Sequence, residues 1–239
     1  MSYDYIEGKK RIKEILNNKL DVIEVKKIPD DKEFTFNNAY KGYVTAIFVD
    51  IRKSTELFSN ENKVIVSKII KSFTSEIIEI LRTDDNLREI GIRGDCVYAI
   101  YTTHYISEID DIFITACFIN CCIDMLNKLF SQKSYPTIAI GVGISTAEEL
   151  VIKAGRYGTG INNKVWIGKA VTLASKLSSI ANKYPYNRLV ISSMTYENIK
   201  KDYQDLLKRE YDRALDLTVY HGCPVNVGFD RWINEGMPE

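Results

Sequence analysis

The stretch Tyr43-Val-Thr-Ala-Ile-Phe-Val-Asp50 decides how the sequence on either side of it is interpreted. Its β-branched and aromatic residues make a nearly continuous apolar run, which is typical of a strand covered on at least one face. From residue 63 to residue 81, apolar side chains recur at intervals of three and four, which predicts an amphipathic helix. The sequence therefore predicts a strand that ends at a carboxylate and is followed by a helix.

The next apolar runs predict a hairpin, a second helix and another strand. Residues 87–93 and 96–101 flank Gly94-Asp95, and a two-residue connection containing glycine between apolar runs is typical of a β-hairpin. A helix over about residues 110–130 and a strand over 137–144 follow. This order of elements is that of a ferredoxin-like α+β domain, with Asp95 at the hairpin tip.

The remaining patterns extend the same sheet. Strands are expected near residues 150–153, into Trp166 and over 188–192, with a helix over 168–183. The glycine-rich segment 155–160 is expected to be a hairpin connection, because it lacks the Lys-Ser/Thr ending of a P-loop. The prediction is a mixed, mainly antiparallel sheet flanked by helices.

One main domain with two short extensions is expected. The 239 residues are 45% hydrophobic, which suits one substantial core. Residues 1–40 are charged and polar, with a weak helix expected at 11–20, and are assigned to an N-terminal lead-in. Residues 41–200 are assigned to the domain and residues 201–239 to a C-terminal extension.

Composition argues against several classes of function. Lys plus Arg and Asp plus Glu each total 32, so the chain lacks the basic excess that attracts a nucleic-acid backbone. No run approaches the roughly 20 apolar residues that span a bilayer, and we expect a cytoplasmic protein without a membrane partner. The five cysteines are expected to be buried free thiols, and the two isolated histidines match no zinc-site spacing.

Asp50 and Asp95 are candidates for a cation site. A strand, a helix and then a hairpin bring the first strand beside the hairpin, so the two carboxylates are expected to converge. Mg²⁺ and Mn²⁺ prefer oxygen ligands and often share one or two carboxylates with substrate phosphates. From spacing alone the alternative stays open that each aspartate serves only its own turn.

Four blocks of sequence carry a resemblance to a known family. They are Phe48-Val-Asp50-Ile-Arg-Lys-Ser-Thr55, Arg93-Gly-Asp95-Cys-Val-Tyr98, Gly141-Val-Gly-Ile-Ser-Thr146 and Trp166-Ile-Gly168-Lys-Ala-Val171-Thr-Leu-Ala174-Ser-Lys176. These blocks resemble, in the same order, the signature blocks of class III adenylate and guanylate cyclases, which close a nucleoside triphosphate into a 3′,5′-cyclic monophosphate. The resemblance extends over about residues 43–193.

The resemblance implies a site with two divalent ions, Mn²⁺ or Mg²⁺. Asp50 and Asp95 match the metal-binding aspartates, and Ile51 matches a residue whose backbone carbonyl helps to hold the second ion. Arg52, Ser54 and Thr55 fall where the substrate triphosphate is bound. Because the family usually carries Gly-Phe-Thr where this chain has Lys-Ser-Thr, a solvated surface arginine is the alternative for Arg52.

The resemblance also implies a homodimer with shared active sites. Thr172 and Lys176 match the catalytic positions that orient the ribose and stabilise charge at the α-phosphate, and these meet the aspartates of the other subunit. Lysine in place of the family's arginine supplies a point charge without bidentate geometry. A solvated polar helix face is the alternative for this pair, which lies at i and i+4.

The base-selecting positions of purine cyclases hold Gly91 and Val165 here, and neither side chain can hydrogen-bond a purine. The lead-in Phe34-Thr-Phe-Asn-Asn-Ala-Tyr40 and the aspartate blocks are similar to those of bacterial pyrimidine cyclases of the Pycsar antiphage system. That resemblance implies conversion of UTP or CTP into the cyclic monophosphate and pyrophosphate, with a separate effector that responds to the product. An ordinary adenylate or guanylate cyclase, or a catalytically degenerate nucleotide sensor, is the alternative.

Overall fold

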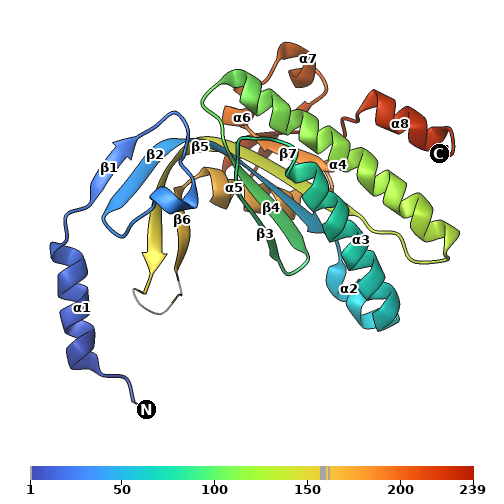
Figure 1. The fold of residues 1–239 in the computed structure, drawn as a ribbon. Coiled ribbons are helices and arrows are strands. Elements are labelled where there is room, and N and C mark those ends of the chain that lie inside the picture. Colours follow the sequence, from blue (N-terminus) through green and yellow to red (C-terminus); the bar gives the residue numbers. More distant parts are fainter. Residues whose placement is uncertain (1, 157–159, 161) are drawn as a thin grey trace.

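The computed structural model describes residues 2–156, 160 and 162–239 and consists of one mixed sheet with helices on both faces (Figure 1). The strands are β1 (Asp21–Glu24), β2 (Asn38–Ile51), β3 (Leu87–Arg93), β4 (Cys96–Thr102), β5 (Ile140–Gly155), β6 (Asn162–Gly168), β7 (Leu189–Ser192), β8 (Lys208–Asp212) and β9 (Leu217–Gly222). The helices are α1 (Tyr5–Asn17), α2 (Ser54–Asn60), α3 (Lys63–Leu81), α4 (Ile106–Gln132), α5 (Ala170–Ile180), α6 (Ser193–Glu197), α7 (Lys201–Gln204) and α8 (Val227–Asn234), with a 3-10 turn over Asp31–Glu33.

The sheet has the order β3-β4-β2-β5-β7-β9-β8, with β1 beside β2 and β6 beside β5. Within the described ranges the paired strands are antiparallel except β1 with β2 and β5 with β7, which are parallel. The succession β2, α3, β3, β4, α4 and β5 gives the expected ferredoxin-like core. The prediction of an α+β fold with a mixed, mainly antiparallel sheet is confirmed.

Helices α3 and α4 cover one face of this sheet. Alternate residues of β2 and β4 point toward them, because successive side chains of a strand face opposite sides. Ile47 and Val49 of β2 are completely buried there, as are Ile69 and Phe73 of α3. The expected helix over residues 63–81 is present with the same bounds.

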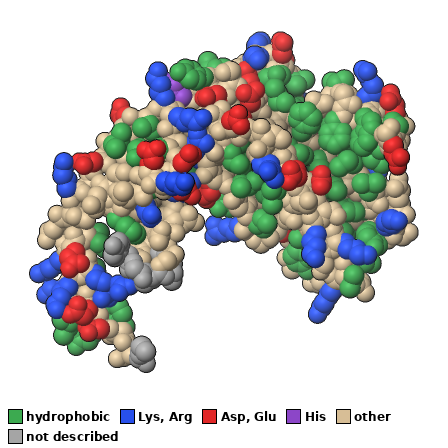
Figure 2. Space-filling view, in the orientation of Figure 1, with side chains coloured by type: hydrophobic (Ala, Val, Ile, Leu, Met, Phe, Trp, Pro, Cys, Tyr) green, Lys and Arg blue, Asp and Glu red, His purple; other side chains and the backbone are tan. Residues whose placement is uncertain are grey.

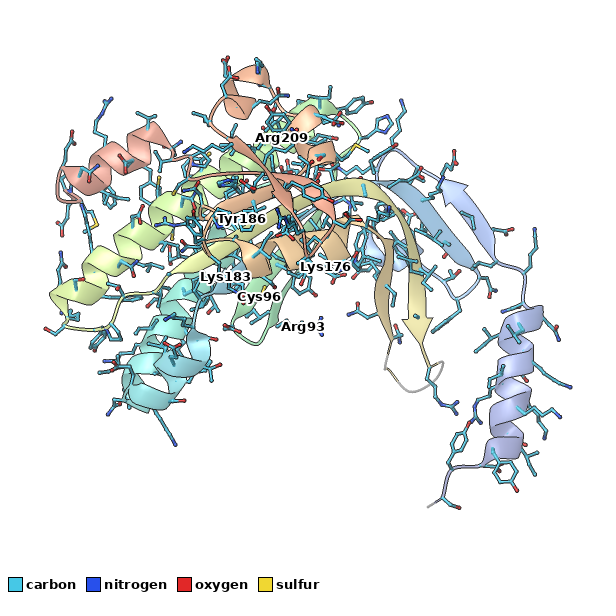
Figure 3. The ribbon with its side chains drawn as sticks, turned by 180° about the vertical axis from the view of Figure 1, so that it is seen from behind. Arg93, Cys96, Lys176, Lys183, Tyr186 and Arg209 are labelled. Atoms are coloured by element: carbon cyan, nitrogen blue, oxygen red, sulfur yellow. The ribbon has the colours of Figure 1, made fainter. Side chains whose placement is uncertain are left out.

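Helix α5 lies on the other face, and glycine makes its close approach to β5 possible (Figure 3). A Cβ atom added at Gly143 would lie 2.2 Å from the Ala174 carbonyl oxygen and from the Ser178 nitrogen of α5. A Cβ atom added at Gly141 would lie 2.4 Å from the Ser178 carbonyl oxygen. Both distances are far below van der Waals contact, so any side chain at either position would move the helix.

The two strands expected over 137–144 and 150–153 are one long strand, β5, so that prediction was wrong. The polar run Ser-Thr-Ala-Glu-Glu between them suggested a break, yet its side chains at Ser145, Thr146 and Glu149 are buried within the strand. Thr146 is hydrogen-bonded to Thr45 at 2.8 Å and to Thr195 at 3.1 Å. Hydrogen bonds between neighbouring elements thus let a polar segment continue the sheet. The segment 155–160, expected as a hairpin connection, lies in part outside the described residues.

The chain ends differ from expectation in detail. The first helix begins after the N-cap Asp4 and ends at Asn17, earlier than the expected 11–20. Residues 201–239, expected as an extension, supply β8 and β9, which extend the main sheet through β7. They also supply α8, which packs on α4 through Phe229 and Phe118.

Surface charge and cysteine burial can be compared with what the composition predicted. Basic and acidic side chains are interspersed over the face seen in Figure 2. All five cysteines are free, but only Cys117, Cys121 and Cys122 are buried, whereas Cys223 is exposed, so the expectation of buried thiols was only partly right. Among the described helices, none combines the length and apolar character needed to cross a membrane.

Replacing Gly143 by alanine should destabilise the protein, because the added methyl group overlaps the backbone of α5. We expect G143A to lower the free energy of unfolding by about 1–3 kcal/mol in denaturant titrations. Gly228 in α8 is the matched control, since an added Cβ there would have its nearest neighbour at 3.5 Å. G228A should leave stability unchanged or slightly raised. Equal stability of G143A and the parent protein would contradict the packing argument.

Candidate functional site

The site is built on the α5 face of the sheet, where β2 ends. Asp50 lies opposite Cys96 of β4 and Gly141 of β5. Asp95 occupies the turn between β3 and β4, directly before Cys96. Because β2 and β4 are paired at this end, the fold brings the two aspartates to the same end of these strands.

The electrostatics of Asp50 reflect this neighbourhood. Burial raises the pKa of Asp50, the Arg52 guanidinium opposes that shift, and the charge of Asp95 raises the pKa further. Lys183, just beyond the end of α5, lowers it. Burial and the nearby Asp50 raise the pKa of the Cys96 thiol to about 12, so this thiol stays protonated. The pKa of Asp50 is therefore raised on balance, because burial and Asp95 outweigh the effect of Arg52 and Lys183.

Arg52 is committed to contacts within the protein. Its guanidinium forms an ion pair with Asp50, and Nη1 donates a hydrogen bond to the Ser179 carbonyl oxygen at 2.8 Å. Only 9% of the side chain is exposed, so the alternative of a solvated surface arginine was wrong. The side chain joins the end of β2 to the end of α5. A triphosphate oxygen would have to compete for a guanidinium that already has partners.

The segment after Asp50 leads into a short helix. The Ile51 side chain is apolar and buried. Only its backbone carbonyl oxygen could bind an ion. Lys53 adopts a left-handed conformation with φ of 55°, after which α2 begins at Ser54. Ser54 is half-buried and Thr55 exposed. A cavity of about 300 Å³ lies beside this segment, lined by Arg52, Lys53, Glu56, Leu57, Glu61, Thr137, Ile138 and Ala139.

Thr172 and Lys176 lie on the exposed side of α5, and Figure 3 labels Lys176 there. The Thr172 hydroxyl donates to the Gly168 carbonyl oxygen at 3.1 Å, one turn earlier. Ala174 and Leu177 of the same helix are completely buried. The helix thus packs through one stripe and presents the two predicted catalytic residues to solvent.

A divalent cation fits the aspartate pair. The described residues contain no cluster of three or more His, Cys, Asp or Glu side chains that could hold a metal. Two carboxylates suffice for a cation that takes its other ligands from backbone oxygen, water and phosphate. The raised pKa of Asp50 and its repulsion from Asp95 are the conditions that a bound cation relieves.

The glycine at position 91 is explained by the side chains that pack against it. Gly91 of β3 lies opposite Tyr98 of β4, and a Cβ atom added at Gly91 would lie 2.7 Å from the Tyr98 hydroxyl. Tyr98 stacks on Phe48 with ring centroids 5.1 Å apart, and its hydroxyl donates to Glu89 at 2.9 Å. Trp166 of β6 also donates to Glu89, at 2.7 Å. Val165, the other base-selecting position, is 41% exposed.

Sequence reasoning missed two residues at this site. Lys183 acts on Asp50 from outside the recognised blocks, and only the fold reveals its proximity. Glu149 contacts the first turn of α5, but in the sequence it is one more residue of the polar run Ser145-Thr-Ala-Glu-Glu149. Its burial is seen only in the fold, so no sequence signal singled it out.

Comparison with known proteins gives consistent matches. A model of the "Adenylate and Guanylate cyclase catalytic domain" matches residues 37–213. A uridylate cyclase of Treponema porcinum is 54% identical over 239 residues, covering 99% of this chain and 83% of that protein. A uridylate cyclase of Gulbenkiania mobilis is 30% identical over 251 residues, covering 98% of this chain and 97% of that one.

A solved structure shares the fold at low sequence identity. The adenylyl cyclase CyaB from P. aeruginosa superposes with a TM-score of 0.63 at 19% identity, covering 76% of this chain and 94% of that chain. At this identity the likeness concerns the fold alone. It agrees with the mixed sheet and flanking helices described above.

Cation binding at the aspartate pair should depend on pH. Because burial and Asp95 raise the pKa of Asp50, a proton competes with a cation at higher pH than at an ordinary aspartate. Stabilisation by Mn²⁺, about 2.7 kcal/mol at 100 times its Kd, should be full above this raised pKa and lost as the pH falls through it. Thermal unfolding with and without Mn²⁺ across a pH series measures the effect. An equal Mn²⁺ shift in D50N would contradict the assignment.

Proposed function

The chain belongs to the family of adenylate and guanylate cyclase catalytic domains, and from this premise we propose that it converts UTP, or alternatively CTP, into the 3′,5′-cyclic monophosphate and pyrophosphate. The observation that carries the proposal is the 54% identity, over nearly the full chain, to a protein named uridylate cyclase. Both aspartates expected of an active enzyme lie at the same end of the paired strands β2 and β4, which favours turnover over nucleotide sensing alone.

Class III cyclases use divalent metal ions, and the residues present fit such ions. Asp50, Asp95 and the Ile51 backbone carbonyl would hold two Mn²⁺ or Mg²⁺ ions, which supply Lewis-acid activation of the ribose 3′-hydroxyl and charge neutralisation on the β- and γ-phosphates. Arg52 offsets part of the negative charge of Asp50, because its guanidinium is paired with that carboxylate. Ser54 and Thr55 offer hydroxyl and backbone N–H donors to the triphosphate.

Thr172 and Lys176 are the proposed catalytic side chains of α5. The Lys176 ammonium stabilises negative charge that develops at the α-phosphate, and it acts there as a point charge. The Thr172 hydroxyl donates to Gly168, so its oxygen lone pairs remain to accept a hydrogen bond from the ribose. Exposure of both side chains agrees with roles at a surface that meets another protomer.

The active unit is a homodimer with two shared sites. Each site takes its aspartates from one protomer and its Thr172 and Lys176 from the other, as twofold symmetry allows in an isologous pair. We place this enzyme in the cytoplasm, as the signal-generating component of a Pycsar antiphage system. The cyclic pyrimidine nucleotide then acts on a separate effector, and neither nucleic acid nor a membrane takes part in the reaction.

A product assay tests the proposed reaction directly. Purified protein incubated with Mn²⁺ and UTP should yield cyclic UMP, identified by chromatography and mass spectrometry, with CTP as the second substrate to compare. Formation of cyclic AMP or cyclic GMP instead would identify a purine cyclase, and nucleotide binding without any product would identify a sensor. D50A and D95A should lower turnover by at least about 100-fold, because each removes a metal ligand.

Mixing two inactive variants tests the shared site. D95N lacks a carboxylate ligand and K176A lacks the ammonium, so each alone should be nearly inactive. In an equimolar mixture that exchanges subunits, half the dimers are mixed, and each mixed dimer has one intact site. We expect recovery of about a quarter of wild-type activity. No recovery, with subunit exchange confirmed by native mass spectrometry, would contradict sites shared between protomers.

A further inference from the structure

Glu149 is a buried carboxylate in the middle of the sheet. It lies on β5 between two glycines, opposite Gly42 of β2 and Gly168 of β6. A Cβ atom added at Gly168 would lie 2.6 Å from the Glu149 carboxyl carbon, so any side chain there would push the carboxyl group aside. The residue is 1% exposed. The sheet therefore accommodates an acidic side chain where an apolar one is usual.

The carboxylate points at the start of α5. Its Oε1 accepts a hydrogen bond of 2.6 Å from the backbone N–H of Ala170, the first residue of the helix. The N-cap residue Lys169 makes no side-chain capping bond, so the cap comes from a neighbouring strand instead. A negative charge at this end is favourable, because the unpaired N–H groups and the helix dipole are positive there.

The charged form of Glu149 is disfavoured by burial and favoured by the amides of the helix. Burial raises the pKa of Glu149, while the amides of Ala170 and Val171 lower it. Its Oε2 has no hydrogen-bond partner among the described residues. A buried carboxyl with one orphan oxygen is costly, and packing alone would be served better by valine or isoleucine.

Helix α5 carries both predicted catalytic residues. Thr172 belongs to the turn whose first amide the carboxylate holds, and Lys176 follows one turn later. At the other end, Gly141 and Gly143 set how closely the helix approaches β5, and Arg52 holds the Ser179 carbonyl. Glu149 is the polar contact that fixes the N-terminal end.

We propose that Glu149 is a positioning residue for the reaction, which anchors the first turn of α5 to β5 and so sets the placement of Thr172 and Lys176. The inference rests on the proposed function for its catalytic consequence, but its structural part stands apart from activity. It acts through α5 and does not touch substrate. Displacement of catalytic groups by about 1 Å can cost up to roughly 100-fold in rate.

The test compares E149A with E149Q and with E148A. E149Q keeps an oxygen that can accept from Ala170, whereas E149A removes it. Glu148 is the matched control, because it neighbours Glu149 in sequence but points to the opposite face and pairs with Lys41 at 2.9 Å. Hydrogen exchange of the 170–173 amides reports the anchor without catalysis, and kcat and KM are measured separately.

We expect E149A to speed exchange in the first turn of α5 by about tenfold and to lower kcat by about tenfold or more, with KM changed less than about twofold. E149Q should recover most of both, and E148A should match wild type.

Exchange unchanged at 170–173 in folded E149A would overturn the inference, as would kcat unchanged despite faster exchange. If E149A does not fold, G168A decides, because its methyl group would push the carboxyl group away from Ala170. Faster exchange at 170–173 together with a lower kcat supports the anchor, and wild-type exchange or wild-type kcat in G168A overturns it. Wild-type protein without cyclase product would refute the proposed function while leaving the exchange result to judge the anchor.

Discussion

Close contact between α5 and β5 is the constraint on which the rest of the site depends. Because Gly141 and Gly143 have no side chains, the helix backbone lies directly on the strand. This places the end of α5 within reach of Arg52, whose guanidinium binds the Ser179 carbonyl oxygen and Asp50 together. One arginine thus links the helix that carries Thr172 and Lys176 to the strand that carries Asp50. A shift of α5 would therefore move the two predicted catalytic residues and disturb the Arg52–Asp50 ion pair together.

The second constraint is electrostatic. Burial opposes the ionisation of Asp50, and repulsion from Asp95, at the same end of the strands, adds to that cost. The protein compensates in part with Arg52 and Lys183, which approach from two different elements. The observed balance is intermediate, with the pKa of Asp50 raised despite its guanidinium partner.

Local patterns predicted the parts of the fold that local physics determines. Residues 63–81 form the expected helix because a single apolar stripe packs on one face, and Gly94-Asp95 forms the expected hairpin turn. The continuity of β5 was missed because Ser145, Thr146 and Glu149 are polar, and the partners of Thr146 and Glu149 lie in other elements, β2, α6 and α5. The contacts of Arg52 and Lys183 were missed for the same reason. Sequence resemblance predicted Asp50, Asp95, Thr172 and Lys176 as site residues, but not the contacts that hold their elements in place.

One departure from the purine-cyclase pattern, glycine at position 91, has a packing explanation. Glycine at position 91 reads in the sequence as the loss of a base-selecting side chain. In the fold that space belongs to the Tyr98 hydroxyl, which is fixed by Glu89 and by stacking on Phe48. Burial and Glu89 raise the pKa of Tyr98 to about 12, so the hydroxyl remains a donor at neutral pH. Trp166 and Tyr98 both donate hydrogen bonds to the Glu89 carboxylate, so the side chain that occupies the space beside Gly91 is held by β3 and is connected through Glu89 to β6.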